Sequence, residues 1–129
     1  SAPIEQRQVG DLQCNIDRFK IVTSLAATGS AVGKIDTTYV HDPATAAAVT
    51  AAQTGLSSAG DGIKTIALSL VTGQAAPATA RTQVQQGLLD AQTALTGITD
   101  ATVNATLADA QSKLASTIQD GTAVVTDCK

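Results

Sequence analysis

The sequence lacks the large aromatic and sulfur-containing side chains that fill most protein cores. It has one Phe, one Tyr, no Trp and no Met in 129 residues, whereas Ala occurs 24 times and Thr 19 times. A core of this chain must therefore consist of Ala, Val, Leu and Ile. Such a core either packs tightly, where helices approach closely, or leaves a space that another molecule occupies. The residues alone leave both alternatives open.

Charge clusters and long apolar runs are also missing. The formal net charge is −3 and no Lys/Arg cluster occurs, so the sequence offers no electrostatic basis for binding nucleic acid or an anionic membrane. No uninterrupted apolar run approaches the length of a transmembrane helix. We expect one domain, with no nucleic-acid partner and no transmembrane segment.

Residue types for catalysis and metal binding are scarce. His41 is the single histidine and lies beside Asp42 in an expected loop, without a nucleophile motif elsewhere. The two cysteines are too far apart in sequence for a zinc knuckle, and the 11 carboxylates are scattered. The sequence therefore predicts a protein that is not an enzyme and that has neither a metal site nor a cofactor.

The two cysteines, Cys14 and Cys128, lie near opposite ends of the chain. They predict a disulfide that closes nearly the whole chain, which is typical of exported proteins, and the alternative is two buried free thiols. Asn104-Ala105-Thr106 is an N-glycosylation sequon, with Asn104 as the acceptor. The chain begins with Ser1 rather than Met. We therefore expect a processed, secreted glycoprotein, extracellular or in a cell wall.

Apolar residues recur at helical spacing in four stretches. The most regular stripe, on which the other helices are expected to pack, is Val49, Ala52, Leu56, Ala59, Ile63, Ile66 and Leu70. Asp42-Pro43 predicts the start of this helix, and Gly73 followed by Pro77 predicts its end.

The other three helices are predicted on both sides of this one. A first helix is expected from Asp11 to about Thr37, with a kink or break near Gly29–Gly33. Its inner face is assigned to Leu12, Ile16, Phe19, Val22 or Thr23, and Ala26, widened by Ile21 and Leu25. Pro77 opens the third helix, with the stripe Val84, Leu88, Ala91, Leu95 and Ile98. Thr99-Asp100 caps the fourth, with Val103, Leu107, Ala110, Leu114, Ile118, Gly121 and Val125 inside.

The predicted fold is all-α. Residues 1–9 are expected to form a flexible N-terminal arm, and residues 10–129 a single up-down-up-down four-helix bundle closed by one disulfide. A break near Gly29–Gly33 would give five helices. In this topology Cys14 and Cys128 fall at the same end of the bundle, which agrees with the predicted disulfide.

The composition and the layout of long helices resemble the fungal cell-wall galactomannoprotein, or hydrophobic-surface-binding, family. The resemblance covers about residues 10–127 and includes Asp42-Pro43 through Leu70 and Thr99-Asp100 through Ile118. It implies a secreted or wall-attached helical protein that holds fatty acids in the bundle interior or adsorbs to hydrophobic surfaces. The terminal cysteine pair departs from most of that family.

We therefore predict a non-enzymatic binder of a lipid or another apolar small molecule in the bundle interior. The alternative is a structural or adhesive wall protein that adsorbs to hydrophobic surfaces without a stoichiometric ligand.

Inward-facing small residues would either open a channel or bring helices into close contact: Ala52, Gly55, Ala59, Gly62, Ala91 and Gly121. The candidate ligand-lining residues are Phe19, Leu25, Leu56, Ile63, Leu88, Leu95, Leu107 and Leu114. Tyr39, His41 and Arg81 would either meet a polar head group or lie in loops and on the surface.

Overall fold

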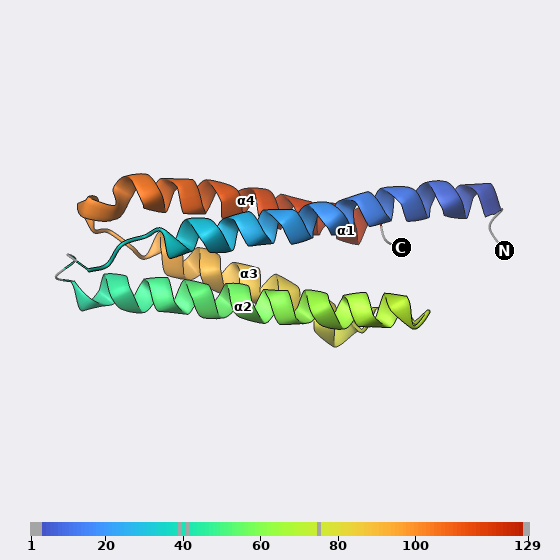
Figure 1. Ribbon diagram of the computed structural model, residues 1–129, viewed down its shortest axis with the longest axis horizontal. Coiled ribbons are helices and arrows are strands. Elements are labelled where there is room, and N and C mark those ends of the chain that lie inside the picture. Colours follow the sequence, from blue (N-terminus) through green and yellow to red (C-terminus); the bar gives the residue numbers. More distant parts are fainter. Residues whose placement is uncertain (1–3, 39, 41, 75, 128–129) are drawn as a thin grey trace.

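The computed structural model describes residues 4–38, 40, 42–74 and 76–127, and these residues contain helices and no strand. The elements are α1 (Ile4–Gly33), α2 (Pro43–Val71), α3 (Ala78–Thr96), the 3-10 turn η1 (Ala101–Val103) and α4 (Asn104–Asp127). Successive helices run in opposite directions, so the four form an up-down-up-down bundle (Figure 1). The predicted helical bundle is therefore confirmed.

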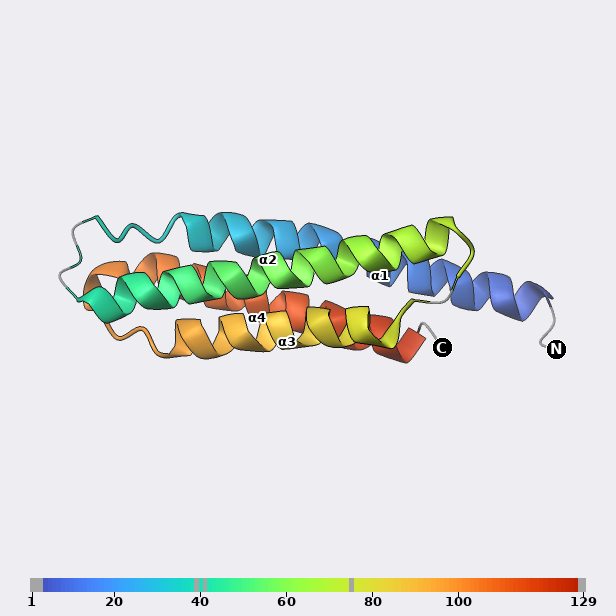
Figure 2. The ribbon, with the colours of Figure 1, turned by 90° about the horizontal axis from the view of Figure 1, so that it is seen from below.

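The bundle consists of two tightly packed helix pairs. α1 lies mainly against α4 and α2 mainly against α3, whereas α1 meets α2, and α3 meets α4, through far fewer contacts. Figure 1 shows the α1/α4 pair above the α2/α3 pair, and Figure 2 shows the same helices turned by 90°. The nature of the side chains within and between the pairs explains this division.

Glycine and alanine hold α2 against α3. A Cβ atom added to Gly55 would lie 2.6 Å from the carbonyl oxygen of Gly87, and one added to Gly62 would lie 2.9 Å from the carbonyl oxygen of Ala80. These distances are far inside van der Waals contact, so only glycine permits the observed approach of the two backbones. The Gln83 side chain adds a cross-link by donating from Nε2 to the Ser58 carbonyl at 3.0 Å.

Small polar residues hold α1 against α4. The hydroxyl groups of Thr28 and Thr117 are 2.9 Å apart, and both side chains are fully buried. One turn away, the Ser24 hydroxyl donates to the Asp120 carboxylate. Because these residues are short, α1 and α4 also approach closely, and the hydroxyl groups satisfy one another inside the contact.

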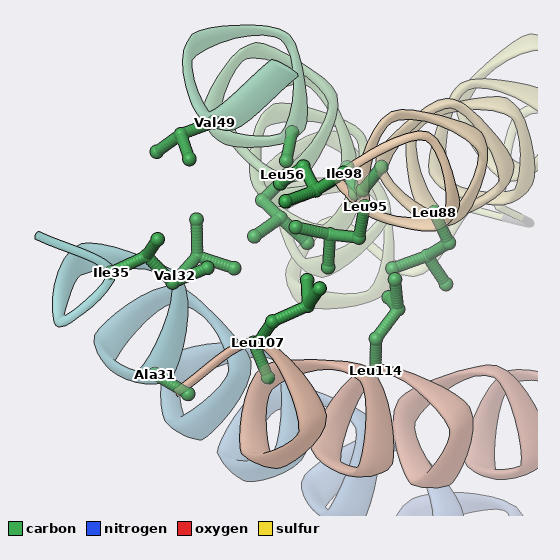
Figure 3. Packing of buried hydrophobic residues seen from close by; sticks show 14 of the residues in the cluster. Ala31, Val32, Ile35, Val49, Leu56, Leu88, Leu95, Ile98, Leu107 and Leu114 are labelled. Carbon is green, nitrogen blue, oxygen red and sulfur yellow. The ribbon is translucent and has the colours of Figure 1, made fainter. Parts of the chain in front are cut away.

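The larger apolar side chains fill the space between the two pairs. In Figure 3, Leu107 and Leu114 of α4 point toward Leu88 and Leu95 of α3, and Val32 of α1 lies toward Val49 of α2. Leu95 and Leu114 are among the largest fully buried side chains of the described chain. The core is therefore a layer of Leu, Val and Ile between two pairs whose own contacts use small residues.

The helix ends follow the sequence signals at Asp42 and Gly73 and depart from them at Asp100. The Asp42 carboxylate accepts from the Ala44 N–H at 3.0 Å, which is the N-cap contact expected before Pro43. Gly73 has a φ of +76° just after α2, as expected of a left-handed residue at a helix end. Asp100 caps η1 rather than α4 itself, since its carboxylate accepts from the Thr102 N–H at 2.9 Å.

The predicted limits of the first helix are wrong. α1 begins at Ile4, so Asp11 lies inside the helix, and residues 4–9 of the predicted arm are helical. These N-terminal turns project beyond the other three helices (Figures 1 and 2). The helix runs through Gly29 without a break and ends at Gly33, where the Lys34 and Ile35 N–H groups bond to carbonyls three residues back. No fifth α-helix therefore forms in the described chain, although η1 adds one 3-10 turn.

Candidate functional site

The most unusual surface of the molecule is an apolar stripe on the outer side of α1. We define this outer stripe as Leu12, Ile16, Phe19 and Val22. Their side chains are exposed by 63%, 41%, 71% and 47%, respectively. Phe19 is the one phenylalanine of the sequence, so the largest apolar ring of the chain faces solvent.

The inner face predicted for the first helix is therefore wrong at its main residues, since Leu12, Ile16, Phe19, Val22, Thr23 and Ala26 are all exposed, whereas Ile21 and Leu25, which were predicted to widen it, do face the core. The buried side of α1 carries Cys14, Asp17, Ile21, Thr28 and Ala31. Most of these side chains are small or polar, and they fit the close approach of α1 to α4, which a phenylalanine ring would prevent.

The buried side of α1 even includes a carboxylate. Asp17 is 3% exposed, and its Oδ1 accepts from Gln13 Nε2 at 3.0 Å, whereas Oδ2 has no hydrogen-bond partner among the described atoms. Burying a carboxylate while leaving Phe19 in solvent opposes the usual partition of side chains. Such local conflicts are common at functional surfaces.

The interior candidates divide into three groups. Leu56, Leu88, Leu95, Leu107 and Leu114 are buried in one cluster, and Leu25 and Ile63 pack at its edge. Phe19 is not part of the interior, so its assignment as a lining residue is wrong. The leucines do lie together, but they contact one another.

The sequence left open whether the small inward-facing residues form a channel or bring helices together. Ala52, Ala59 and Ala91 are fully buried, and Gly55 and Gly62 contact the backbone of α3. Gly121 faces Ile21, where an added Cβ would lie 3.4 Å from Cδ1. Of the two alternatives left open by the sequence, close helix contact is therefore the one observed at Gly55 and Gly62.

The two best-formed depressions of the described chain lie on the surface of α2. One is polar and is lined by Thr50, Gln53, Thr54, Ser57, Ser58 and Asp61. The other is lined by Lys64, Ala67, Leu68 and Val71. Both are open to solvent, and neither is lined by the leucines of the core.

The remaining candidates are isolated from one another. Arg81 is exposed near the start of α3, whereas Tyr39 and His41 lie outside the described residues. The described chain contains no group of three His, Cys, Asp or Glu side chains that could hold a metal ion. None of its described helices has the length and apolar character needed to cross a membrane.

One carboxylate is tuned by a local hydrogen-bonding turn. The pKa of Asp36 lies below its ordinary value of 3.8. The larger cause is a hydrogen bond from the Thr38 side chain, and the smaller one is the Thr38 backbone N–H, which donates to Asp36 Oδ1 at 2.9 Å. Asp36 is exposed in the connection after α1, so this contact orders a loop rather than a binding site.

Two covalent features were predicted, glycosylation of Asn104 and a disulfide between the two cysteines. Asn104 is exposed at the first residue of α4, where the sequon is accessible, and its glycosylation stays a prediction. Cys14 is 5% exposed, and the described chain contains no free cysteine. Cys128 lies outside the described residues, so the disulfide between the two also stays a prediction.

Comparison with known proteins adds no relative to this picture. No family model, curated protein or solved structure matches the chain. The resemblance to the hydrophobic-surface-binding family therefore stays a prediction based on composition and helix layout.

Proposed function

We propose that this protein is a secreted, non-enzymatic protein that adsorbs to hydrophobic surfaces through the outer stripe of α1. The observation that carries the proposal is the exposure of Phe19, at 71%, on a helix whose buried side contains Asp17 at 3% exposure. The fold thus presents to solvent the side chains that gain most from leaving water.

Adsorption would follow from burial of the outer stripe against an apolar surface. A fully buried side chain of this size contributes about 1.5–3 kcal/mol, and side chains pressed onto a flat surface contribute part of that. The four residues lie on one helix within three turns, so they can touch a surface together without any change in the bundle.

The test is adsorption of purified protein to polystyrene beads and to hexadecane droplets in water. The double variant Leu12→Ser/Phe19→Ser should bind at least about tenfold more weakly, because it removes the two most exposed members of the stripe. The matched control is Leu68→Ser/Val125→Ser, which removes two side chains that are each 68% exposed on other helices. Equal loss in both double variants would contradict the proposal.

A second candidate function is uptake of a fatty-acid-like molecule between the two helix pairs. It is favoured by the packing difference, because the pairs are joined to each other mainly through the leucine layer. Separation along this layer would expose Leu56, Leu95 and Leu107 to an acyl chain, whose burial contributes about 0.8 kcal/mol per methylene. Neither of the two best-formed depressions is lined by the leucine layer, so this function calls for the pairs to part.

Native mass spectrometry after delipidation and addition of palmitate tests this second function. A one-to-one adduct that Phe19→Ser leaves unchanged and Leu95→Trp abolishes would support it, since the larger ring fills the layer. Adsorption to beads without any discrete palmitate adduct would contradict the uptake function and would leave surface adsorption as the supported one.

We also propose that Cys14 and Cys128 form a disulfide. Thr28 faces Thr117 and Ile21 lies beside Gly121, so the antiparallel register carries residue 14 to the level of the end of α4 at Asp127. A disulfide would stabilise the fold by about 4–5 kcal/mol in the chain-entropy model. Alkylation of denatured, unreduced protein tests the pairing, and modification of both cysteines would contradict it.

A further inference from the structure

We infer that a second copy of this chain covers the outer stripe of α1 in solution, through an antiparallel contact between the two α1 helices. The inference concerns the same stripe as the proposed function and adds its regulation, because two copies joined through the stripe cannot adsorb through it. It depends on the spacing of the exposed residues, on the distribution of large and small side chains and on the charges beside them.

The exposed side of α1 follows a seven-residue repeat. With Ile16 at position a, the a and d positions between residues 12 and 26 are Leu12, Ile16, Phe19, Thr23 and Ala26, all exposed. Position f, on the opposite side of the helix, holds Cys14, Ile21 and Thr28, all buried. An exposed stripe with a period of 3.5 residues is the form of a surface that packs against another helix.

The described helices of the same molecule leave this stripe uncovered. α1 is packed on its inner side by α4 and α2, and its N-terminal turns project beyond the rest of the bundle (Figures 1 and 2). The described part of the chain supplies no helix to complete the contact, and the partner helix is assigned here to another molecule. A second copy carries the same stripe, and a two-fold axis makes such a surface self-complementary.

The order of large and small side chains favours the antiparallel arrangement. Between residues 12 and 26 the a and d positions are large in the first half, at Leu12, Ile16 and Phe19, and small in the second half, beyond the outer stripe, at Thr23 and Ala26. Antiparallel pairing places the large half of one copy on the small half of the other. It sets Ile16 against Phe19 of the second copy twice, whereas a parallel pair would oppose the two Ala26 residues across a gap.

The charges beside the stripe permit this contact. Between residues 13 and 29 the flanking e and g positions are Gln13, Asn15, Lys20, Val22, Ala27 and Gly29. Lys20 is the one charged residue among them, and the antiparallel register brings it level with Asn15 of the second copy, with Gln13 two residues away, so no like charges meet. The contact is smaller than the roughly 20–30 residues per side of a standard stable interface, so we expect a dissociation constant on the order of 10 µM or weaker.

Sedimentation equilibrium of the full chain tests the inference. The mass should rise from 12.9 kDa toward twice that value as the concentration increases from about 1 µM to about 1 mM. Phe19→Asp and Ile16→Lys should each remain monomeric when alone. Mixed in equal amounts, the two variants should associate one to one. In the mixed pair the new carboxylate at position 19 of one copy faces the new ammonium group at position 16 of the other. The second contact between positions 16 and 19 keeps its native Ile16 and Phe19 side chains.

Leu68→Asp is the matched control, since Leu68 is 68% exposed on α2 and should leave the association unchanged. Circular dichroism checks that every variant keeps its helical content. A wild-type chain that stays monomeric at all concentrations, or a mixture that fails to associate, would overturn the inference. Bead adsorption measured below the dissociation constant, where the chain is monomeric, separates the two ideas. Monomers that adsorb support the proposed function whether or not the chain dimerises, and monomers that do not adsorb, in a chain that dimerises at higher concentration, leave only the inference.

Discussion

Gly55 of α2 and Gly87 of α3 bring their backbones into direct contact, and a Cβ atom on Gly55 would lie 2.6 Å from the Gly87 carbonyl oxygen. This contact sets the distance between α2 and α3, and Ala59 and Ala91 continue it along the pair with fully buried side chains. The pair is therefore held by backbone approach, whereas the two pairs are held to each other by leucines. The molecule has two kinds of interface, with different responses to substitution.

Gly55→Ala should destabilise the protein by about 1–3 kcal/mol, because the added methyl group forces α2 and α3 apart. Urea unfolding followed by circular dichroism measures the change. Gly60→Ala is the control within the same helix. A Cβ on Gly60 meets nothing within 4 Å, so that variant should be more stable than the wild type by about 0.5–1 kcal/mol. Equal stabilisation in both variants would show that α2 and α3 are not in backbone contact.

Phe19→Ala should change the free energy of unfolding by less than about 0.5 kcal/mol, because the ring is 71% exposed. Leu95→Ala should cost about 2–5 kcal/mol, since Leu95 is fully buried in the layer between the pairs. Both are measured by thermal and urea unfolding. A large loss of stability in Phe19→Ala would place the outer stripe inside the fold and would remove the basis of the proposed function.

Helical periodicity predicted most of the architecture. The stripe on α2 is buried at Val49, Ala52, Leu56 and Ala59, and Ile63 and Ile66 pack at its edge, while the side chain of Leu70 lies outside the described part. The α3 stripe is buried throughout. The last stripe is buried from Val103 in η1 to Leu114 in α4, but Val125 is 68% exposed and Val124 packs on the core instead. Regular apolar spacing was sufficient for these helices because most residues of their stripes face inward.

The same rule failed for α1, because hydrophobicity was the wrong criterion there. The face that packs on α4 is selected by small size and by hydrogen bonding, as Thr28 and Ser24 show. The seven-residue spacing of Cys14, Ile21 and Thr28 was present in the sequence, but nothing in it marked this face as the buried one. The outer stripe could not be distinguished from a core stripe, since apolar residues on two sides of a helix give one inward face and one outward face without saying which is which.

Asp36 should contribute to stability above its pKa and lose that contribution in acid. The pKa of Asp36 is lowered by the Thr38 side chain and then by the Thr38 backbone N–H, so the folded state favours the charged carboxylate. The contribution is complete above the ordinary value of 3.8 and disappears as pH falls through the lower folded pKa. Urea midpoints of wild type and Asp36→Asn between pH 7 and pH 2 measure it. The difference in urea midpoint between wild type and Asp36→Asn should be constant down to about pH 4 and should disappear below that. A difference that grows in acid would contradict the assignment.

Thr28 and Thr117 should be energetically coupled, because their hydroxyl groups are 2.9 Å apart in a fully buried contact between α1 and α4. Each hydroxyl also lies within hydrogen-bonding distance of a carbonyl of its own helix, at Ser24 and Lys113. Thr28→Val or Thr117→Val alone should cost about 1 kcal/mol, since the remaining hydroxyl loses a partner. The double variant should cost less than the sum of the two by at least about 0.5 kcal/mol, because two methyl groups then meet without an unsatisfied polar atom. Additive losses in this double-mutant cycle would mean that the two residues do not touch, and that α1 packs on α4 through a different face.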